Sequence, residues 1–365
     1  MILLAFDKFK GTLDARSVCA AAARGLQSAG VPAQSIDLCP LSDGGDGFLD
    51  CLASPPRTKD WHPGETGPDF VPRRVPFLTD GQGGAIVESA KVCGLAMLPP
   101  EKLNPLRTTS YGLGEVLRYL RDEGFREAIV GLGGTATCDG GIGMLAALGW
   151  RFLDDHGRSV HPSGGCLPEI RRVEPGPPLG LRVVAATDVW NPLYGPNGAA
   201  HVFAPQKGAD AEGVRVLDRG LRNLARLMAG LSPHDHSQTP GAGAAGGLGY
   251  AILQALGGRV ESGAALALRE VGFRERLAMA TLCITGEGKT DRQTLEGKLP
   301  YEVLRACREA GVPCLLLSGT LDLDPAAVGF DDGIAAARPG TLASEADVAE
   351  ACAELLRRAG RRPGD

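Results

Sequence analysis

The chain has 365 residues, of which 44% are hydrophobic and 22% are charged, and its formal net charge is −5. This composition is typical of a globular protein that is large enough for two domains. An acidic chain without a visible basic face does not favour nucleic-acid binding, and no apolar run approaches the length of a membrane span. We therefore expect neither a nucleic-acid partner nor a membrane partner.

Ten cysteines are scattered along the chain without a CxxC pair. This distribution favours reduced thiols over a disulfide framework or a zinc site. The chain begins directly with a strand-like apolar run and lacks the basic segment and cleavage site of a signal peptide. Together these features predict a cytoplasmic protein.

The first segment predicts a strand, a loop and a helix. Ile2–Phe6 is a continuous apolar run, as expected of a strand that is buried in a parallel sheet. Val18, Ala22 and Leu26 recur at helical spacing before a stop at Gly30. A second strand, 35–38, leads into a loop rich in glycine and aspartate at 42–47.

The rest of the chain continues this alternation after a stretch rich in proline, glycine and charge at 54–76, which we interpret as a linker or domain crossing. Further strands are predicted at 84–89, 128–130, 182–186, 281–285, 312–317 and 330–337. Further helices are predicted at 111–121, 217–231 and 299–310.

Strands that alternate with helices predict an α/β fold. Because both ends of the chain have the same pattern, we expect a doubly wound, Rossmann- or flavodoxin-like domain that is discontinuous in sequence. It would comprise 1–62 and 278–365. The residues between, 63–277, would form a second, inserted α/β domain with a mixed sheet.

Two glycine-rich loops are candidates for phosphate binding, because a glycine loop that opens a helix offers free N–H groups and the positive end of the helix dipole. One contains Gly131, Gly133 and Gly134, and it follows a predicted strand. The other contains Gly241, Gly243 and Gly246, and it matches the dinucleotide fingerprint letter by letter. No strand precedes this second loop, which argues against an NAD-dependent oxidoreductase but leaves it as an alternative.

Charged residues follow several predicted strands in glycine-rich loops. Phosphoryl transfer needs cations for the polyphosphate, carboxylates for magnesium and a base that orients the attacking hydroxyl. The recurrence of such residues at strand ends favours this chemistry over chance surface loops. They are Lys8, Lys10, Asp43, Asp188, Lys207, Asp291 and Lys298.

The same segments resemble the type I glycerate kinase family. The matching stretches include DKFKGTL at 7–13, PLSDGGDG at 40–47, TSYG at 109–112, GLGGTATCDGGIG at 131–143, PQKGA at 205–209 and the segments 188–192, 240–247 and 286–298. They occur in family order over almost the whole chain. Ser42, Asp46 and Cys138 stand where the family usually has alanine, glutamate and asparagine.

The resemblance implies phosphorylation of D-glycerate by ATP with Mg²⁺, with 2-phosphoglycerate as the usual bacterial product. It also implies two α/β domains with the active site in the cleft between them. A non-catalytic nucleotide- or metabolite-binding protein on the same scaffold remains the alternative from another class, although binding alone needs fewer charged residues at strand ends.

We assign roles to the charged residues from their chemistry, as hypotheses. Lys8 or Lys10, together with Lys207, would hold the ATP phosphates or the glycerate carboxylate. Lys298 and the two glycine loops would contact the nucleotide. Asp43 and Asp291 would hold magnesium, and Asp188 would be the base for the 2-hydroxyl.

Overall fold

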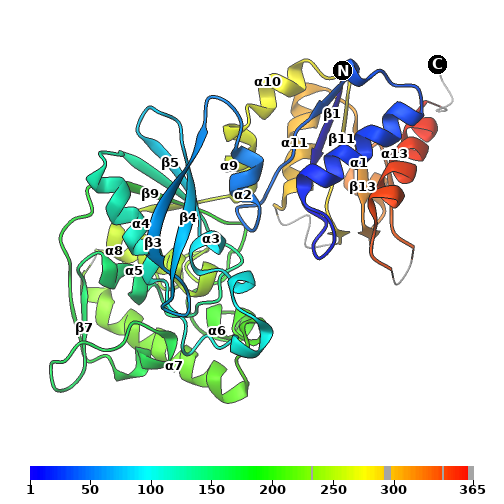
Figure 1. Cartoon of the computed structure of the whole chain (residues 1–365). Coiled ribbons are helices and arrows are strands. Elements are labelled where there is room, and N and C mark those ends of the chain that lie inside the picture. Colours follow the sequence, from blue (N-terminus) through cyan, green and yellow to red (C-terminus); the bar gives the residue numbers. More distant parts are fainter. Residues whose placement is uncertain (232, 292–296, 339–340, 361–365) are drawn as a thin grey trace. The chain divides into compact units, whose positions relative to one another are not determined.

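The computed structural model describes residues 1–365 except 232, 292–296, 339–340 and 361–365 (Figure 1). The chain forms two compact units. The first unit comprises Met1–Asp43, Asp50–Ser54 and Ser262–Asp365, and the second comprises Gly44–Leu49 and Pro55–Glu261. The main crossings therefore lie at 54/55 and 261/262, whereas the sequence led us to expect them near 62 and 278.

The sheet of the first unit is parallel and doubly wound, in the order β15-β13-β11-β1-β2. Its strands are β1 (Ile2–Phe6), β2 (Ile36–Leu38), β11 (Leu282–Gly286), β13 (Cys314–Ser318) and β15 (Asp332–Ala335). From β1 the chain continues to β2 on one side, whereas β11, β13 and β15 follow one another on the other side. The winding direction therefore reverses between β1 and β11, which is where open α/β sheets bind their ligands.

Helices cover both faces of this sheet. Leu4 and Phe6 of β1 pack with α1 (Ala15–Ser28) and α13 (Glu345–Ala359), which lie side by side in Figure 1. Leu3 and Ala5, which alternate with them, pack toward α9 (Gly263–Glu270), α10 (Phe273–Ala278) and α11 (Leu299–Ala310). Because both faces are buried, the strand is apolar throughout, and this explains why it could be predicted from sequence.

The sheet of the second unit is mixed, in the order β10-β9-β6-β5-β4-β3. Its strands are β3 (Thr58–Thr66), β4 (Pro72–Thr79), β5 (Gly84–Glu88), β6 (Glu127–Gly131), β9 (Arg182–Ala186) and β10 (Arg259–Glu261). The strands β5, β6, β9 and β10 are parallel, and β3 and β4 extend the sheet as an antiparallel hairpin.

This hairpin corrects the interpretation of 54–76 as a linker. The strand β3 lies at the edge of the sheet, where the register shifts between His62 and Glu65. Edge strands tolerate bulges, glycine and proline that would disrupt a central strand, so the composition of this stretch concealed two strands.

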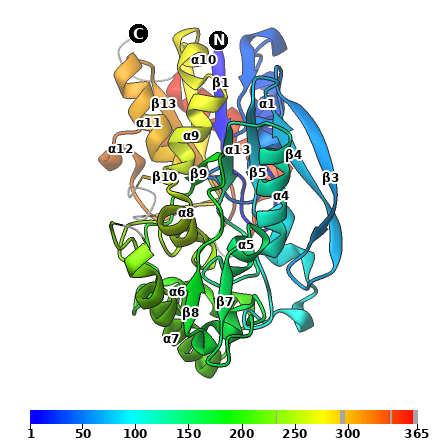
Figure 2. The same ribbon diagram turned by 90° about the vertical axis from the view of Figure 1, so that its left-hand side faces the viewer.

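One large apolar core joins the sheet of the second unit to its helices. These include α4 (Tyr111–Asp122), α5 (Ile142–Ala147), α7 (Ala211–Met228) and α8 (Leu248–Leu256), and α4 packs beside α5 (Figure 2). The helix α7 begins six residues before the predicted start at 217, because Asp210 caps it by accepting a hydrogen bond from the N–H of Gly213.

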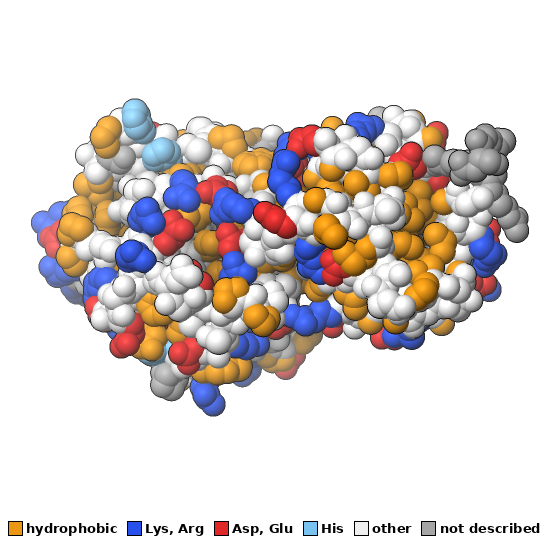
Figure 3. Space-filling view, turned by 90° about the horizontal axis from the view of Figure 1, so that it is seen from above, with side chains coloured by type: hydrophobic (Ala, Val, Ile, Leu, Met, Phe, Trp, Pro, Cys, Tyr) orange, Lys and Arg blue, Asp and Glu red, His pale blue; other side chains and the backbone are white. Residues whose placement is uncertain are grey.

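The remaining α-helices and strands are short. They are α2 (Phe48–Leu52), α3 (Ala90–Cys93), α6 (Ala199–Phe203), α12 (Pro325–Val328), β7 (Arg151–Leu153), β8 (Arg172–Glu174), β12 (Lys289–Thr290) and β14 (Thr320–Leu321). Among the helices of the described residues, none combines the length and the apolar character needed to cross a membrane. On the face seen in Figure 3, Lys and Arg side chains are interspersed with Asp and Glu.

Candidate active site

The first group of candidate residues lies at the carboxyl end of β1, beside the point where the winding reverses. Asp7 directly follows the strand, is only 7% exposed, and accepts a hydrogen bond of 2.7 Å from the backbone N–H of Lys8. The Nζ atom of Lys8 lies 3.8 Å from Asp7 Oδ1 and 3.5 Å from Asp43 Oδ1. Two residues predicted from sequence, Lys8 and Asp43, are thus brought together, with a buried carboxyl beside them.

The end of the neighbouring strand β11 adds a second pair of charges. Glu287 is buried, and its Oε2 lies 3.9 Å from Nζ of Lys298, the residue that precedes α11. A Cβ atom on Gly288 would lie 2.8 Å from the backbone nitrogen of Lys10, so only glycine lets the loops after β1 and β11 approach this closely. We refer to Asp7, Lys8, Asp43, Glu287 and Lys298 as the strand-end cluster.

The electrostatics of the strand-end cluster centre on Asp7. Burial raises the pKa of Asp7, the charges of Asp43 and Glu287 raise it further, and Lys8 lowers it, with a result of about 7. A carboxyl in this state exchanges its proton near neutral pH, which is a common property of functional sites. Asp7 and Glu287 were not among the residues selected from sequence. The available signal was their position directly after a strand.

The other predicted metal ligand of this unit, Asp291, lies just beyond Gly288. Its Oδ2 atom is 3.6 Å from Nζ of Lys289, which also lies 3.0 Å from Oδ2 of Asp322. This pairing follows from the short parallel ladder between β12 and β14. Residues 292–296, which belong to the segment that resembles the family, lie outside the described residues.

In the second unit, the glycine loop after β6 packs against the segment Gly44–Leu49. A Cβ on Gly131 would lie 2.7 Å from the carbonyl oxygen of Gly44, and a Cβ on Gly133 would lie 2.6 Å from Cα of Gly45. Gly134, whose φ is +61°, would collide with Asp46 if it carried a side chain. Close backbone packing therefore accounts for Gly131 and Gly133, and the positive φ accounts for Gly134, whether or not a phosphate also binds here.

Glu88, at the end of β5, fixes the same segment. Its buried carboxylate accepts hydrogen bonds from the N–H groups of Gly47 at 3.2 Å and of Leu49 at 2.9 Å. This residue was not selected from the sequence either. It links the strand ends of the second sheet to the loop that follows Asp43 in the chain.

The glycines at 241–246 have similar packing roles. A side chain on Gly243 would collide with the carbonyl oxygen of Pro192, and one on Gly246 with the carbonyl oxygen of Thr137. A Cβ on Gly241 would lie 2.9 Å from the side chain of Val260. The strand that a dinucleotide fingerprint requires before its first glycine is absent from the described residues 233–240.

Lys207 is almost fully buried, at 4% exposure, although a lysine in a loop is usually solvated. Its Nζ atom donates to Thr135 Oγ1 at 3.1 Å and to the carbonyl oxygen of Thr137 at 2.6 Å. Burial lowers the pKa of Lys207, against the influence of the nearby acidic groups. These bonds attach Lys207 to the loop between β6 and α5.

A buried aspartate holds the other end of this loop. Asp139 is 0% exposed, and its Oδ2 accepts hydrogen bonds from the N–H and the hydroxyl of Ser110 at 2.8 and 2.7 Å. Its Oδ1 accepts a hydrogen bond from the N–H of Gly141 at 3.0 Å. The loop is therefore positioned by a buried cation and a buried carboxyl, both attached to its backbone.

Asp188 lies in the turn after β9. The turn is held by Thr187, whose N–H donates to the carbonyl oxygen of Glu261 at 3.1 Å and whose hydroxyl accepts a hydrogen bond from the N–H of Val189 at 3.2 Å. Asp188 itself is half-buried. Asp188 thus follows the carboxyl end of β9, the strand that was predicted at 182–186.

Comparison with known proteins decides the family. A model described as the glycerate kinase family matches residues 2–362. The chain belongs to the glycerate kinase family. It is 38% identical to a glycerate kinase of Bacillus subtilis (strain 168), over 99% of this chain and 96% of that protein. It is 35% identical to a glycerate 2-kinase of Escherichia coli (strain K12), over 88% of this chain and 86% of that protein.

A crystal structure leads to the same family. The protein from Salmonella typhimurium LT2 provisionally named glycerate kinase 2 superimposes with a TM-score of 0.82 at 30% identity, with 99% of both chains covered. The match supports the two-domain α/β fold expected from the resemblance. Membership of the glycerate kinase family also favours the kinase interpretation over an NAD-dependent oxidoreductase.

Within this glycerate kinase-family chain, the predicted residues divide between the two units. Lys8, Lys10, Asp43, Asp291 and Lys298 belong to the first unit, at or near its strand ends. The two glycine loops, Lys207 and Asp188 belong to the second unit, also in loops that follow strands or precede helices.

Proposed function

We propose that the chain transfers the terminal phosphoryl group of ATP to the 2-hydroxyl of D-glycerate, with Mg²⁺, and forms 2-phosphoglycerate. Membership of the glycerate kinase family supports phosphorylation of glycerate. The use of ATP and Mg²⁺ is supported by the strand-end cluster. It sets cations and carboxylates side by side where the sheet of the first unit reverses its winding. Phosphoryl transfer needs both kinds of group.

In this proposal the lysines of the first unit hold the polyphosphate. Lys8 and Lys298 each lie within 4.0 Å of a carboxylate, so each ammonium group is already oriented at the strand ends. Lys10 follows in the same loop, and its backbone packs against Gly288. Cations held in place in advance stabilise the charge of the transferring group without reorganising during the reaction.

The carboxylates of the first unit fit a magnesium ion in their chemistry. Mg²⁺ takes oxygen ligands and is usually held by one or two carboxylates together with phosphate oxygens and water. The side chain of Asp43 is 39% exposed, so it can reach an ion that also contacts a phosphate. We propose that Asp43 and Asp291 hold the ion, which would neutralise charge on the phosphates when bound.

The second unit would supply the base and a positioning residue. Asp188, at the end of β9, would accept the proton of the 2-hydroxyl. An ordinary aspartate suffices, because a loose transition state needs this proton to leave only late. Lys207 is bonded to Thr135 and Thr137, so we propose that it acts by holding the loop between β6 and α5 in place. The ten free cysteines support a reducing compartment, and we place the reaction in the cytoplasm.

The test is incubation of the chain with ATP, Mg²⁺ and D-glycerate, followed by NMR identification of the phosphorylated product. We expect 2-phosphoglycerate, and we expect excess EDTA to stop its formation. ADP formation that does not depend on D-glycerate, or that persists in EDTA, would contradict the proposal. Binding of both ligands without turnover would instead support a non-catalytic binding protein.

A pair of variants tests the role of the strand-end cluster. Lys8→Met removes a cation of the cluster, whereas Arg274→Met removes an exposed cation of the same unit that pairs with Glu309. We expect Lys8→Met to lower kcat/KM for ATP by at least about tenfold, since a hydrogen bond to a charged group contributes about 1.5–3 kcal/mol. Arg274→Met should stay near the parental value. Equal effects of the two variants would count against the proposed phosphate site.

A further inference from the structure

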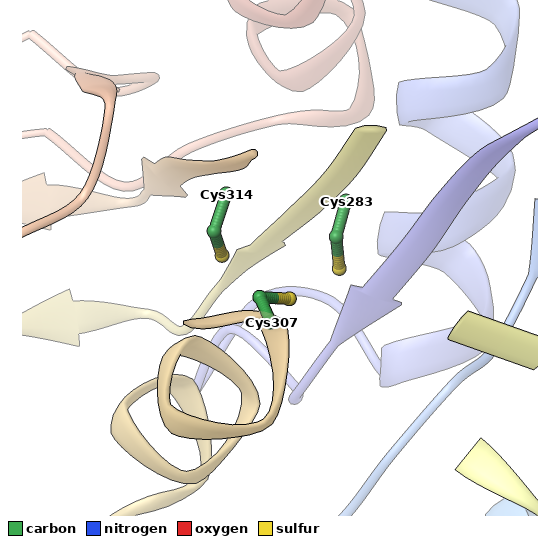
Figure 4. A group of neighbouring side chains, drawn as sticks. All are labelled: Cys283, Cys307 and Cys314. Carbon is green, nitrogen blue, oxygen red and sulfur yellow. The ribbon is translucent and has the colours of Figure 1, made fainter. Parts of the chain in front are cut away.

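Three buried cysteines converge in the first unit, away from the strand-end cluster. Cys283 lies in β11, Cys307 in α11 and Cys314 in β13, and their exposed fractions are 0%, 0% and 1%. All three sulfur atoms lie within 4.8 Å of one another. Figure 4 shows the side chains turned toward one another between the two strands and the helix.

The topology explains this convergence. The strands β11 and β13 are parallel neighbours, and Cys283 stands opposite Cys314 in their register, so both side chains point to the same face. The helix α11 connects these two strands and packs on that face, where Cys307 joins the same apolar cluster. The three residues are thus placed by one βαβ unit, although their spacing in the sequence forms no recognisable motif.

The geometry suits a single ion with three sulfur ligands. Sulfur atoms bound to one ion at about 2.3 Å, in a plane at equal angles, lie about 4.0 Å apart. The observed limit of 4.8 Å is close to this separation, so small side-chain rotations would suffice. In the described residues, no fourth His, Cys or carboxylate completes the group, which disfavours a tetrahedral zinc site.

The thiols also interact with one another. Hydrogen bonds from the Cys283 and Cys314 thiols lower the pKa of Cys307, against the effect of burial, which raises it. The buried Cys352 of α13 behaves differently, because burial alone raises the pKa of its thiol to about 12. A hydrogen bond with Cys307 raises the pKa of Cys283, and burial raises the pKa of Cys314. The convergence of the three sulfur atoms, and not their ionisation, is therefore the observation that indicates a metal site.

We propose that Cys283, Cys307 and Cys314 form a binding site for one soft, thiophilic metal ion, of the class of Cu(I) and Cd(II). Thiolate sulfur selects such ions over Mg²⁺, which prefers oxygen, so this site would be distinct from the proposed magnesium site. When a divalent ion binds, two of the thiols release their protons to solvent and the third binds as the neutral thiol. A divalent ion bound by two thiolates and one thiol leaves no net charge in the core, which avoids the cost of a buried charge.

The experiment uses the reduced, full-length chain and Cd²⁺ as the probe. Binding is followed by the ultraviolet thiolate-to-cadmium charge-transfer absorption until the signal is constant, because the buried sulfurs will be reached slowly. We expect one tightly bound equivalent and a rise in melting temperature. X-ray absorption at the cadmium edge should give a coordination number of three sulfur atoms. A coordination number of one or two, or the absence of tight binding, would overturn the proposal.

Alanine variants assign the site. Cys283→Ala, Cys307→Ala and Cys314→Ala should each weaken Cd²⁺ binding by about tenfold or more and abolish the rise in melting temperature, since each removes a ligand. Cys352→Ala is the matched control, because it truncates an equally buried cysteine of the same unit. It should bind Cd²⁺ like the parent. Parental binding by any folded variant of the three, or loss of binding in the control, would overturn the assignment.

Discussion

Gly133 approaches Gly45 so closely that a Cβ atom on Gly133 would lie 2.6 Å from the Cα atom of Gly45. Both residues belong to glycine-rich stretches that resemble the glycerate kinase family. Glu88 fastens the same region by accepting the N–H groups of Gly47 and Leu49. Glycine at these positions is therefore needed for one backbone to pass another, a role that sequence alone cannot separate from ligand binding.

We expect Gly133→Ala to destabilise the chain and to reduce glycerate kinase activity. A Cβ atom at 2.6 Å from backbone forces the segment Gly44–Leu49 to shift, and overpacking of this kind typically costs about 1–3 kcal/mol. Gly230→Ala is the control, because nothing lies within 4 Å of a Cβ built on Gly230. Thermal unfolding and initial rates of both variants provide the test. A Gly133→Ala chain that melts like the parent would show that the two segments can separate at little cost.

Burial of Glu65 predicts a dependence of stability on pH. Burial, a hydrogen bond with Glu115 and the charge of Glu115 together raise the pKa of Glu65 from 4.5 to about 8, although Arg118 lowers it. Because the folded chain binds this proton more tightly than the unfolded chain, the stabilisation is complete below about pH 4.5 and is lost as the pH rises toward about 8. The slope is at most about 1.4 kcal/mol per pH unit.

Glu65→Gln should remove this slope. An amide does not ionise and can still donate a hydrogen bond to Glu115, so the melting temperature of the variant should exceed that of the parent increasingly from about pH 5 to about pH 8. Glu174→Gln changes an exposed partner of Arg151 and should leave the slope unchanged. If the melting temperatures of the parent and Glu65→Gln change with pH in parallel, the pKa of Glu65 in the folded chain is not raised.

A methionine variant of Lys207 separates positioning from direct ligand contact. Lys207→Met removes the hydrogen bonds to Thr135 and Thr137, so amide hydrogen exchange in 131–143 should become faster and kcat should fall. Lys102→Met, an exposed lysine of the same unit, is the control. If activity is lost while exchange in 131–143 stays at the parental rate, Lys207 contacts a ligand directly.

The sequence predicts an element well where one physical signal dominates. The bounds of Ile2–Phe6, Arg182–Ala186 and Leu299–Ala310 agree with the structure. Apart from Arg182, the first two are apolar runs in buried parallel strands, and the third has clear helical periodicity. The hairpin of β3 and β4 was missed because an edge strand tolerates proline, glycine and charge.

The parts of the site that sequence does not predict are those that depend on tertiary contacts. The burial of Lys207 follows from two partners about 70 residues away in the chain. The convergence of Cys283, Cys307 and Cys314 depends on strand register, and no spacing rule indicates it. Charged residues at strand ends could be selected as candidates, because parallel strands bring their carboxyl ends to one edge. The partner that each of these residues contacts could not be predicted.

Asp188 is the residue whose role is tested most directly by a conservative change. Its carboxylate is half-buried in the turn after β9, which Thr187 anchors through bonds to Glu261 and Val189. If Asp188 is the base, Asp188→Asn should lower kcat by about 10²-fold or more, because general-base contributions are about 10²–10⁴-fold. The melting temperature should stay close to that of the parent, since an amide has a similar size and still accepts a hydrogen bond.

The alternative is that Asp188 serves the turn itself, as aspartate often does. In that case Asp188→Asn would turn over D-glycerate at nearly the parental rate with a small change in stability. Asp155→Asn, in an exposed turn of the same unit, controls for the loss of one negative charge. Measuring kcat and melting temperature for the three chains separates the two roles. A near-parental kcat for Asp188→Asn would move the proposed base to Asp43 or Asp291, because these are the other carboxylates selected at the strand ends.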